Sequence, residues 1–374
     1  MKVAFLSTFY PFRGGIAQFN AALYRALENL GHEVKAFNFS VQYPAALFPG
    51  KTQKVTSEDI ADAIPSVRSL NAVNPASYWS TAKKIKQYQP DLLVVGYWMP
   101  FMAPSLGTVI KRLEKHIKIV SIVHNAIPHE TSKLDTILGN YFFNHNTKVI
   151  ALSKAVEQDI NSAYPSIKTK VLHHPTYTHF GNLIPKSDAR EKLGIGSDKI
   201  VLLFFGLVRP YKGLDVLLST LALLDQRFQL VIAGETYGSF SAYQEIIDKN
   251  NLSNRIFHFD QYISDDEVST YFSVADTCVL PYKSATQSGV VAIAQHFGVP
   301  VFVSDVGGLN EFIIHEKTGF LMEAPCAELF AESIKNAVET KQLEKVRAFL
   351  NQETEDQLSW EDFAQAVIDF SYSE

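Results

Sequence analysis

The chain alternates strand-length apolar runs with segments of helical periodicity, and it does so in two successive series. This alternation is typical of parallel β-sheets built from βαβ units. In the first series we expect strands at 3–7, 34–39, 92–96, 117–123, 149–152 and 171–173. In the second series we expect strands at 200–205, 228–233, 256–259, 277–280 and 299–303. The sequence therefore predicts an α/β protein with two Rossmann-like, doubly wound domains.

The boundary between the two series falls in a polar stretch, residues 175–198, that contains two prolines and three glycines. Within it, Asp188 and Glu191 have the spacing of a capping box and predict a helix start. We place an N-terminal domain at 1–180, a C-terminal domain at 181–358 and a terminal helix at 359–374. A length of 374 residues suits two such domains.

Charge is divided unevenly along the chain. Residues 1–180 carry 19 Lys and Arg against 11 Asp and Glu, whereas the whole chain has a net charge of −5. A basic first half suits an anionic surface or substrate, and ordinary solvated helix faces explain its lysine groups equally well. These groups lack the interleaved aromatic residues of a strand-binding groove, so we expect no nucleic-acid partner.

Cysteine content and hydropathy indicate in which cellular compartment the protein is expected. The two cysteines, Cys278 and Cys326, cannot build a disulfide framework, and no apolar stretch reaches about 18 residues. We expect a cytoplasmic protein with no membrane span. An aromatic and apolar loop at 39–51 could meet a lipid-linked acceptor at the inner face of the membrane, or fold onto its own domain.

Two cations follow the strand at 200–205. Arg209 and Lys212 stand three residues apart between a strand end and a helix start, and Gly213 follows them. An arginine can fork across two phosphate oxygens, a lysine adds a point charge, and a helix N-terminus attracts anions. Ligands bind at the carboxyl ends of parallel strands, so this loop predicts a diphosphate clamp with an exposed lysine.

A second anion site is predicted where the strand at 277–280 leads into an apolar helix. Gln287, Ser288, Gly289 and Val290 open that helix, and its backbone N–H groups and dipole favour a phosphate. The next loop repeats the design with a glycine pair and Glu311 at a helix start, although Glu311 could be only a partner of the helix dipole.

The first half offers a glycine pair and two histidine groups. Gly14 and Gly15 open a helix after the first strand, which fits either an anion site or a tight turn. His124 ends one strand, and His173 and His174 end another. With no helical histidine pair, no nearby cysteine and no Asp-x-Asp, we predict no metal. Dinucleotide and P-loop fingerprints are also missing from the sequence.

Together these motifs resemble the retaining glycosyltransferases of the GT-B fold, family four, over nearly the whole chain. The matching segments are Gly14-Gly15, Gly31-His32-Glu33-Val34, Arg209 with Lys212-Gly213, Gln287-Ser288-Gly289-Val290, Gly298-Val299-Pro300 and Asp305-Val306-Gly307-Gly308-Leu309-Asn310-Glu311. The resemblance implies two domains facing across a cleft, with the donor on the C-terminal domain and the acceptor on the N-terminal one. It also implies that a terminal helix near Trp360 crosses back onto the N-terminal domain.

The resemblance implies transfer of a sugar from a nucleoside-diphosphate sugar to a hydroxyl of a glycan or lipid-linked acceptor, as in polysaccharide biosynthesis. The resemblance also implies that the enzyme requires the nucleoside-diphosphate sugar as a substrate and requires neither a cofactor nor a metal. The leaving phosphate takes the proton of the acceptor, while the enzyme supplies orientation and charge. The implied catalytic residues are His124, Arg209 and Lys212. The donor-binding residues are Gly15, Gly206, Gly213, Gly234, Tyr262, Gln287, Ser288, Gly289, Val290 and Glu311, and the acceptor-binding residues are Gly14, His129 and His174.

One departure from the family pattern leaves alternatives open. The family usually shows two glutamates, and the equivalent positions here are Ala285 and Ile293, as in subgroups with Gln-Ser-Gly in this loop. A nucleotide-sugar 2-epimerase of the same fold is an alternative, but it would be expected to keep acidic residues for proton transfer. A non-catalytic protein that binds nucleotide sugars is another. The donor sugar, the base and the acceptor remain open.

Overall fold

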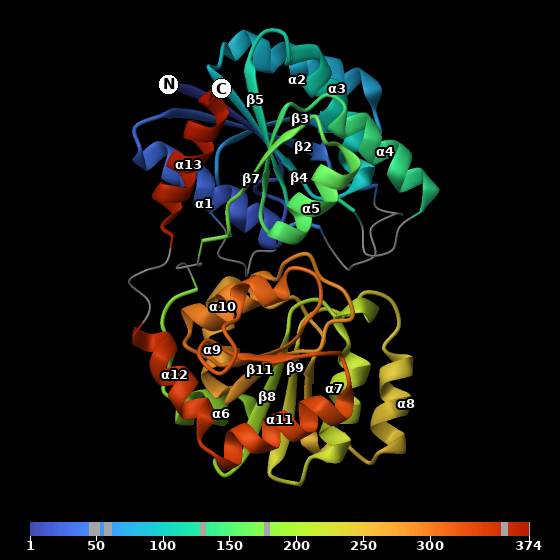
Figure 1. Ribbon diagram of the computed structural model, residues 1–374, viewed down its shortest axis with the longest axis vertical. Helices are drawn as coiled ribbons and strands as arrows, with labels where there is room; N and C mark the ends of the chain where they lie inside the picture. Colours follow the sequence, from blue (N-terminus) through green and yellow to red (C-terminus); the bar gives the residue numbers. More distant parts are fainter. Residues whose placement is uncertain (45–52, 56–61, 128–131, 176–179, 353–357, 374) are drawn as a thin grey trace. The chain divides into compact units, whose positions relative to one another are not determined.

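The computed structural model describes residues 1–44, 53–55, 62–127, 132–175, 180–352 and 358–373, which form two compact units (Figure 1). Unit 1 contains the described residues up to 175 together with 358–373, and unit 2 contains residues 180–352. Each unit has one parallel β-sheet with helices on both faces. The predicted α/β class with two doubly wound domains is confirmed.

The sheet of unit 1 has the order β3-β2-β1-β4-β5-β6-β7, with all neighbours parallel. The order reverses on either side of β1, so loops at the carboxyl ends of β1 and β4 diverge and leave room for a ligand. The strands are β1 (Lys2–Leu6), β2 (Glu33–Val41), β3 (Ser66–Asn71), β4 (Leu92–Tyr97), β5 (Lys118–Val123), β6 (Lys148–Ala151) and β7 (Lys168–Val171).

Two apolar cores cover the faces of this sheet. Residues of α2 to α5 pack on one face, and residues of α1 and α13 pack on the other. The helices are α1 (Gly15–Asn29), α2 (Pro75–Tyr88), η2 (Pro100–Met102), α3 (Ala103–Leu113), α4 (Lys133–Phe143), α5 (Lys154–Ala163) and α13 (Trp360–Tyr372).

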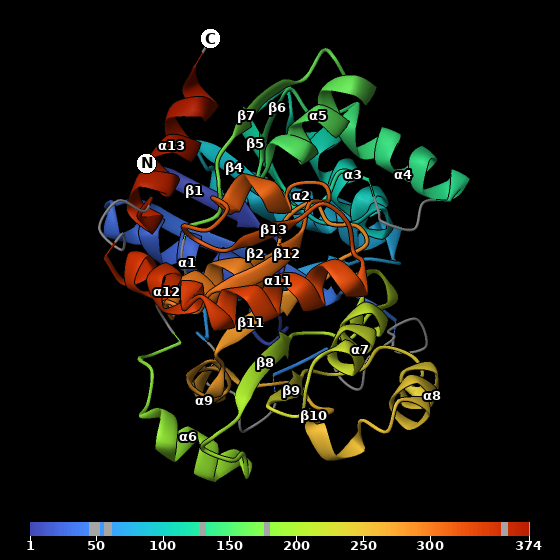
Figure 2. The same cartoon turned by 60° about the horizontal axis from the view of Figure 1, so that its bottom comes forward.

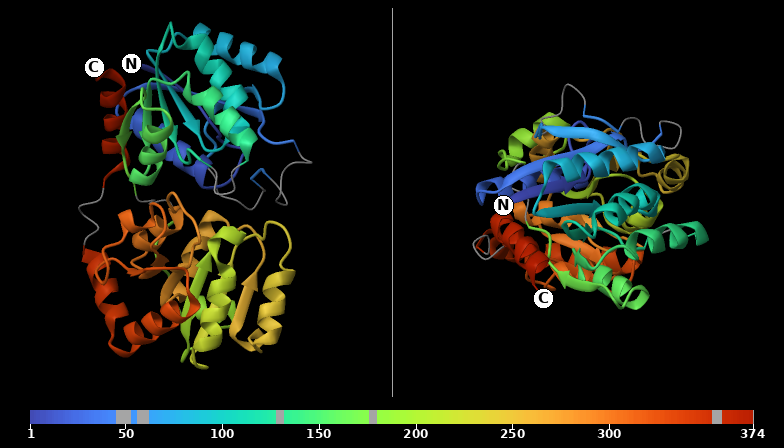
Figure 3. Two further views of the ribbon diagram at one scale, coloured as in Figure 1. Left: turned by 45° about the vertical axis from the view of Figure 1, so that its right-hand side comes forward. Right: turned by 90° about the horizontal axis from the view of Figure 1, so that it is seen from above.

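The last helix of the described chain, α13, belongs to unit 1. It packs against α1 and β5, so both ends of the chain lie in this unit (Figures 1 and 3). Ser359 caps α13 by accepting a 3.0 Å hydrogen bond from the backbone N–H of Asp362. Lys148 Nζ donates hydrogen bonds to the carbonyl oxygens of Phe370 and Ser371, at 3.0 and 3.2 Å, and so fixes the C-terminal end of α13.

The sheet of unit 2 has the order β10-β9-β8-β11-β12-β13 and is also parallel throughout. One face is covered by α7, α8, α11 and α12, and Figure 2 shows α7 beside α11. The strands are β8 (Ile200–Phe205), β9 (Phe228–Ala233), β10 (Ile256–Phe259), β11 (Thr277–Leu280), β12 (Val301–Ser304) and β13 (Phe320–Met322). The helices are α6 (Lys186–Leu193), η3 (Pro210–Lys212), α7 (Leu214–Leu223), α8 (Ser241–Lys249), η4 (Ser253–Arg255), α9 (Asp265–Val274), α10 (Gly289–His296), η5 (Leu309–Phe312), α11 (Ala327–Glu339) and α12 (Gln342–Gln352).

Some sequence-based expectations are wrong in detail. The strands β3 and β13 were not predicted, and β7 ends at Val171, where the predicted strand began. The capping box at Asp188 and Glu191 is absent, because α6 begins at Lys186 with Pro185 at its N-cap and no side-chain cap. The helix α6 packs on α9, so part of the predicted linker is an ordered element of unit 2.

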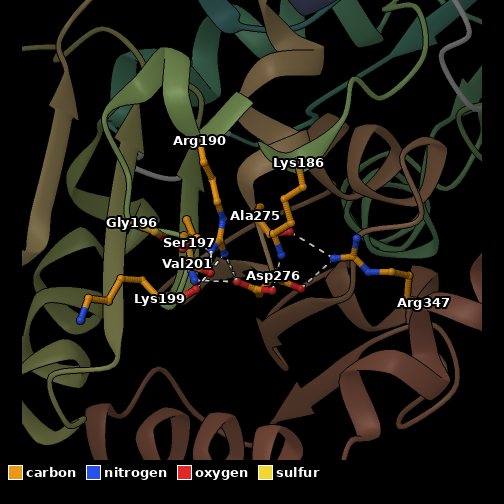
Figure 4. A network of polar contacts seen from close by, with 9 residues as sticks. All are labelled: Lys186, Arg190, Gly196, Ser197, Lys199, Val201, Ala275, Asp276 and Arg347. Carbon is orange, nitrogen blue, oxygen red and sulfur yellow. Dashed lines mark hydrogen bonds and ion pairs between the residues drawn. The ribbon is translucent and has the colours of Figure 1, made fainter. Parts of the chain in front are cut away.

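Asp276, between α9 and β11, ties several elements of unit 2 together (Figure 4). Its carboxylate accepts hydrogen bonds from Lys186 Nζ at 2.5 Å, Arg190 Nη2 at 3.3 Å and the backbone N–H of Val201 at 2.8 Å. Its backbone carbonyl accepts one from Arg347 of α12 at 3.1 Å. These contacts, which we call the Asp276 network, fix α6, β8 and α12 to one point.

Candidate active site

Two segments that were each predicted to bind an anion meet at the carboxyl end of β8. They are the loop that carries Lys212 and the start of α10. Gly206 follows that strand with a positive φ of 89°. A Cβ placed on Gly206 would lie 3.3 Å from Lys212 Nζ and 3.6 Å from Val290 Cγ2. The Lys212 ammonium and the first turn of α10 therefore lie beside the same point of the backbone. A positive charge beside the N-terminus of a helix is an arrangement that binds phosphate.

The loop between β8 and α7 is braced by the segment that follows β11. Gly213 approaches that segment so closely that a Cβ on it would lie 1.9 Å from the carbonyl oxygen of Pro281. The backbone N–H of Lys283 donates to the Tyr211 carbonyl at 2.7 Å, and its ammonium lies 2.7 Å from the Asp215 carboxylate. The clamp residues consequently sit on a loop with little freedom to move.

Lys212 differs from the exposed lysine that the sequence suggested. Its side chain is half-buried, with Nζ 5.5 Å from the centre of the Tyr282 ring. Burial, followed by the positive charge of Arg209, lowers the pKa of Lys212 to about 8. Among the described residues, no carboxylate forms an ion pair with Arg209 or Lys212. Two neighbouring cations without a counter-ion favour an anionic ligand.

The N-terminus of α10 is open. Ser288 occupies the N-cap position with extended backbone (φ −142°), and its side chain accepts no hydrogen bond from the helix. The first N–H groups of a helix have no partner within it, so those of Gly289 and Val290 are available to an anion. The predicted roles of Gln287 to Val290 would use these backbone groups, and the Val290 side chain lies near the same point of Gly206 as Lys212 Nζ.

Other predicted donor residues lie at the same edge of the sheet. Gly234, after β9, comes so close to Gly206 that a Cβ on Gly234 would lie 2.1 Å from the Gly206 carbonyl oxygen. Tyr262 follows β10 and is half-buried. Glu311 lies in η5, whose preceding residue Gly308 donates to the carbonyl of Ala285 at 3.2 Å.

In unit 1, His124 directly follows β5, and its backbone N–H donates to the carbonyl of Tyr97 at 2.9 Å. The side chain is only 3% exposed, and Nε2 is buried without a hydrogen-bond partner in the described structure. Burial, followed by the charge of His174, lowers the pKa of His124 to about 3. The imidazole is therefore neutral at physiological pH and can hydrogen-bond a hydroxyl, but it cannot serve as a cation.

Phe19 of α1 brings the predicted histidines together. Its ring centre lies 4.9 Å from that of His124 and 5.0 Å from that of His174, both at steep angles. Trp360 and Phe363 of α13 contact the same ring at 5.2 and 5.6 Å. We call these five residues the Phe19 cluster. The position of His124 thus depends on α1 and α13 as well as on β5.

The remaining predicted residues of unit 1 are placed in part. Gly14 is the N-cap of α1 with φ 106°, and a Cβ there would meet no atom within 4 Å. Gly15 is the first residue of α1. His129 lies outside the described residues, as does most of the predicted lipid-facing loop at 39–51.

Three side chains at these strand ends were not predicted. Tyr282 lies below the Lys212 ammonium, and Tyr237 lies 5.5 Å from the Arg209 guanidinium. Asn20 of α1 is 1% exposed; its amide donates to Ser7 Oγ and to the Thr8 carbonyl, both at 2.9 Å, and its Oδ1 has no partner in the described structure. An aromatic residue in the loop after a strand, or an asparagine on an apolar helix face, is the sequence signal that could have identified these side chains.

No group of three or more His, Cys, Asp or Glu side chains is arranged to hold a metal ion in the described part of the chain. None of the helices in that part of the chain has the length and apolar character needed to cross a bilayer.

Comparison with known proteins places this arrangement among sugar-transferring enzymes. Residues 185–356 match the family model for glycosyl transferases group 1, and residues 13–179 match that for glycosyltransferase family 4. An uncharacterized glycosyltransferase of Methanocaldococcus jannaschii is 24% identical, over 96% of this chain and 95% of its own. The lipopolysaccharide 1,2-N-acetylglucosaminetransferase of Salmonella typhimurium is 25% identical, over 68% of this chain and 67% of its own.

Solved structures show the same two-domain architecture. Anabaena HepE in complex with UDP and glucose superimposes with a TM-score of 0.73 at 17% identity, covering 99% of this chain and 97% of that one. The fold is therefore GT-B, with two Rossmann-like domains. With the two family models and the relatives above, it follows that the chain is a glycosyltransferase.

Proposed function

We propose that this glycosyltransferase moves a sugar from a nucleoside-diphosphate sugar to a hydroxyl of a glycan or lipid-linked acceptor, with retention of configuration and without a metal. The observation that carries the proposal is the meeting of Lys212 and the open N-terminus of α10 beside Gly206, with Arg209 as a second cation. The structure of HepE with UDP-glucose lends support, since that protein has the same fold.

The proposed reaction needs no nucleophile from the enzyme. The acceptor hydroxyl attacks the anomeric carbon from the side on which the diphosphate leaves, and the departing phosphate oxygen takes up the electron pair and then the hydroxyl proton. Arg209, Lys212 and the amides of α10 stabilise the charge that develops on the diphosphate. Because His124 is neutral, its role is a hydrogen bond from the imidazole to the donor sugar, which orients it.

We assign donor binding to unit 2 and acceptor binding to unit 1, where Gly14 and His174 lie near the start of α1 and on the Phe19 cluster. The Salmonella relative, by its name, acts on lipopolysaccharide, which supports a lipid-linked glycan as the acceptor class. Contact with an anionic membrane through the basic first unit belongs to the same proposal.

The first test is a thermal-shift screen with UDP, GDP and ADP in EDTA. A nucleotide at about 100 times its dissociation constant adds roughly 2.7 kcal/mol to the free energy of unfolding. The matching nucleotide sugar and an acceptor should then yield free diphosphate and a glycoside of unchanged anomeric configuration, which NMR resolves. An epimerised donor, or binding without turnover, would instead favour one of the alternative functions.

Two controls complete this test. Lys212→Ala should keep the wild-type fold and lower the turnover number by about 10²- to 10³-fold, since it removes one charged donor to the developing anion. Activity should persist in EDTA, because the protein's own cations neutralise the diphosphate. Loss of activity that Mg²⁺ restores would contradict the metal-independent mechanism.

A further inference from the structure

Both cations of the proposed diphosphate clamp lie over the ring of a tyrosine. The Arg209 guanidinium lies 5.5 Å from the centre of the Tyr237 ring, and the Lys212 ammonium lies 5.5 Å from the centre of the Tyr282 ring. Both distances fall within the roughly 6 Å over which an aromatic face attracts a cation. Other cations of unit 2 contact carboxylates instead, as in the Asp276 network. The clamp cations therefore have a different kind of partner.

The order of the strands explains this arrangement. β8 lies between β9 and β11 in the sheet of unit 2 (Figure 1). Arg209 and Lys212 lie on the loop that leaves the carboxyl end of β8. Tyr237 and Tyr282 lie on the loops that leave β9 and β11. Because the three strands are parallel, their loops leave the same edge of the sheet, and each neighbour of the cation loop supplies one tyrosine.

The backbone fixes Tyr237 beside Arg209. The N–H of Val208 donates to the carbonyl of Glu235 at 3.0 Å, and the N–H of Tyr237 donates to the carbonyl of Val208 at 3.1 Å. Val208 itself is fully buried in the core of unit 2. The parallel pairing of β8 with β9 thus continues beyond the strand ends, and it places the residue after Val208 next to the tyrosine.

Tyr282 is fixed by burial, since its side chain is only 2% exposed. Its ring meets that of Tyr211, the residue before Lys212, edge to face with the centres 6.2 Å apart. The hydrogen bond from the backbone N–H of Lys283 to the Tyr211 carbonyl, at 2.7 Å, joins the same two loops. The ring of Tyr282 therefore occupies a fixed position on the loop beside the Lys212 ammonium.

We propose that Tyr237 and Tyr282 are positioning residues of the donor site, which hold the two cations in place and leave their charge available to the diphosphate. A carboxylate in the same position would hold a cation more firmly, but its negative charge would compete with the ligand. The face of an aromatic ring attracts a cation through its quadrupole and carries no net charge. The inference rests on the proposed function in one respect, that Arg209 and Lys212 bind the diphosphate.

Calorimetric titration of the whole protein with inorganic pyrophosphate, in EDTA, tests the proposal without a nucleotide base. Tyr237→Leu and Tyr282→Leu each remove a ring and should raise the dissociation constant of pyrophosphate about three- to tenfold. Tyr237→Phe and Tyr282→Phe keep the ring and should stay within about twofold of the wild type. Equal losses in the leucine and phenylalanine variants would assign the effect to the hydroxyl groups and contradict the proposal.

Double-mutant cycles separate this role from a general loss of packing. In a protein that already carries Arg209→Gln, Tyr237→Leu should leave the dissociation constant of pyrophosphate unchanged, because the ring no longer has a cation to hold. The crossed pair, Lys212→Gln with Tyr237→Leu, is the matched control, and its two effects should multiply. A tyrosine that only fills space would weaken binding by the same factor in both backgrounds.

Stability is measured separately, since Tyr282→Leu also removes a buried ring. Tyr243 of α8 is 9% exposed and packs on Phe240 with the ring centres 5.3 Å apart. Tyr243→Leu should therefore lower the urea midpoint of unfolding without changing the affinity for pyrophosphate. Tyr237 is half-buried, so its variants decide the question even where Tyr282→Leu does not fold.

Three further results would overturn the inference. Leucine variants that bind pyrophosphate as tightly as the wild type, while Arg209→Gln binds it weakly, would leave the clamp and the proposed function intact but remove the role of the rings. Weaker binding of UDP, GDP or ADP by Tyr237→Leu, with unchanged binding of pyrophosphate, would place its ring against the nucleotide base. A wild type that does not bind pyrophosphate would refute the clamp itself, on which the proposed function also rests.

Discussion

Lys212 holds its charge only up to about pH 8 in the ligand-free protein, because burial and Arg209 both disfavour the ammonium. We therefore expect the dissociation constant of the bound nucleoside diphosphate to rise as the pH passes about 8, by up to tenfold per pH unit. Burial keeps neighbouring groups from titrating in this range, since it raises the pKa of Cys278 to about 12 and that of Tyr282 above its usual value.

Calorimetric titrations of the nucleotide across this range check the expectation. Lys212→Arg keeps its charge at every pH tested and should give a flat profile above pH 8. The same slope in both proteins would assign the titration to another group. The stability effect has the opposite sign: a lysine with a lowered pKa disfavours the folded state when it is charged, so its cost disappears as the pH rises from about 8 toward 10.5.

Gly289 permits a direct test of the backbone amides. It is the first residue of α10, and Ser288 before it is extended, so a proline at 289 fits both the helix and the preceding residue. Gly289→Pro removes one N–H and should weaken diphosphate binding by about 1.5–3 kcal/mol with little loss of stability. Gly289→Ala keeps the N–H and serves as the control. Equal affinities of the two variants, measured by calorimetry, would contradict the role of this amide.

The residues of the proposed donor site could be selected from the sequence, but the convergence of Lys212 and Val290 could not. Arg209, Lys212 and the segment from Gln287 to Val290 follow strands, and the carboxyl ends of strands are where ligands bind in such sheets. That Lys212 and Val290 meet beside Gly206 depends on the packing of two loops far apart in sequence. Tyr282 was missed because a buried aromatic after a strand equally well belongs to the core.

Among the elements, the central strands were predicted well, whereas the edge strands β3 and β13 were missed, β7 was misplaced and only the edge strand β10 was predicted at its observed bounds. β1, β4, β8 and β9 are mostly buried and appear as nearly continuous apolar runs. β3 has one buried residue in six, and β13 has only three residues, so neither gives a clear pattern. An edge strand is exposed along one side, so its residues need not form the nearly continuous apolar run by which a buried central strand is recognised.

The Asp276 network predicts a single polar change that weakens unit 2. Asp276→Ala would leave Lys186 and the buried Arg190 without their carboxylate. Removing one partner from a buried ion pair costs about 3–5 kcal/mol, and partial exposure of Asp276 reduces this to about 2–3. Urea denaturation measures the change. Asp266→Ala, at an exposed position of α9, should cost less than about 1 kcal/mol. Equal losses would mean that the network adds little stability.

At the scale of the whole molecule, the two units should respond differently to loss of α13. A chain ending at residue 357 would uncover Phe19 and other core residues of unit 1 but leave unit 2 intact. Differential scanning calorimetry should then show an early transition for unit 1. The nucleotide should still raise the melting temperature of unit 2. If that nucleotide effect also vanished, the donor site would depend on unit 1.

The position of α13 also sets the order in which the protein can be completed on the ribosome. Residues 180–352 are synthesised after most of unit 1 and before the helix that closes its core. At about 5–20 residues per second, unit 1 waits roughly 10–40 seconds with this face of its sheet covered by α1 but not yet by α13. Unit 2, whose segments are contiguous, can fold during that time. The nascent unit 1 is therefore the part of this chain that most needs protection by chaperones.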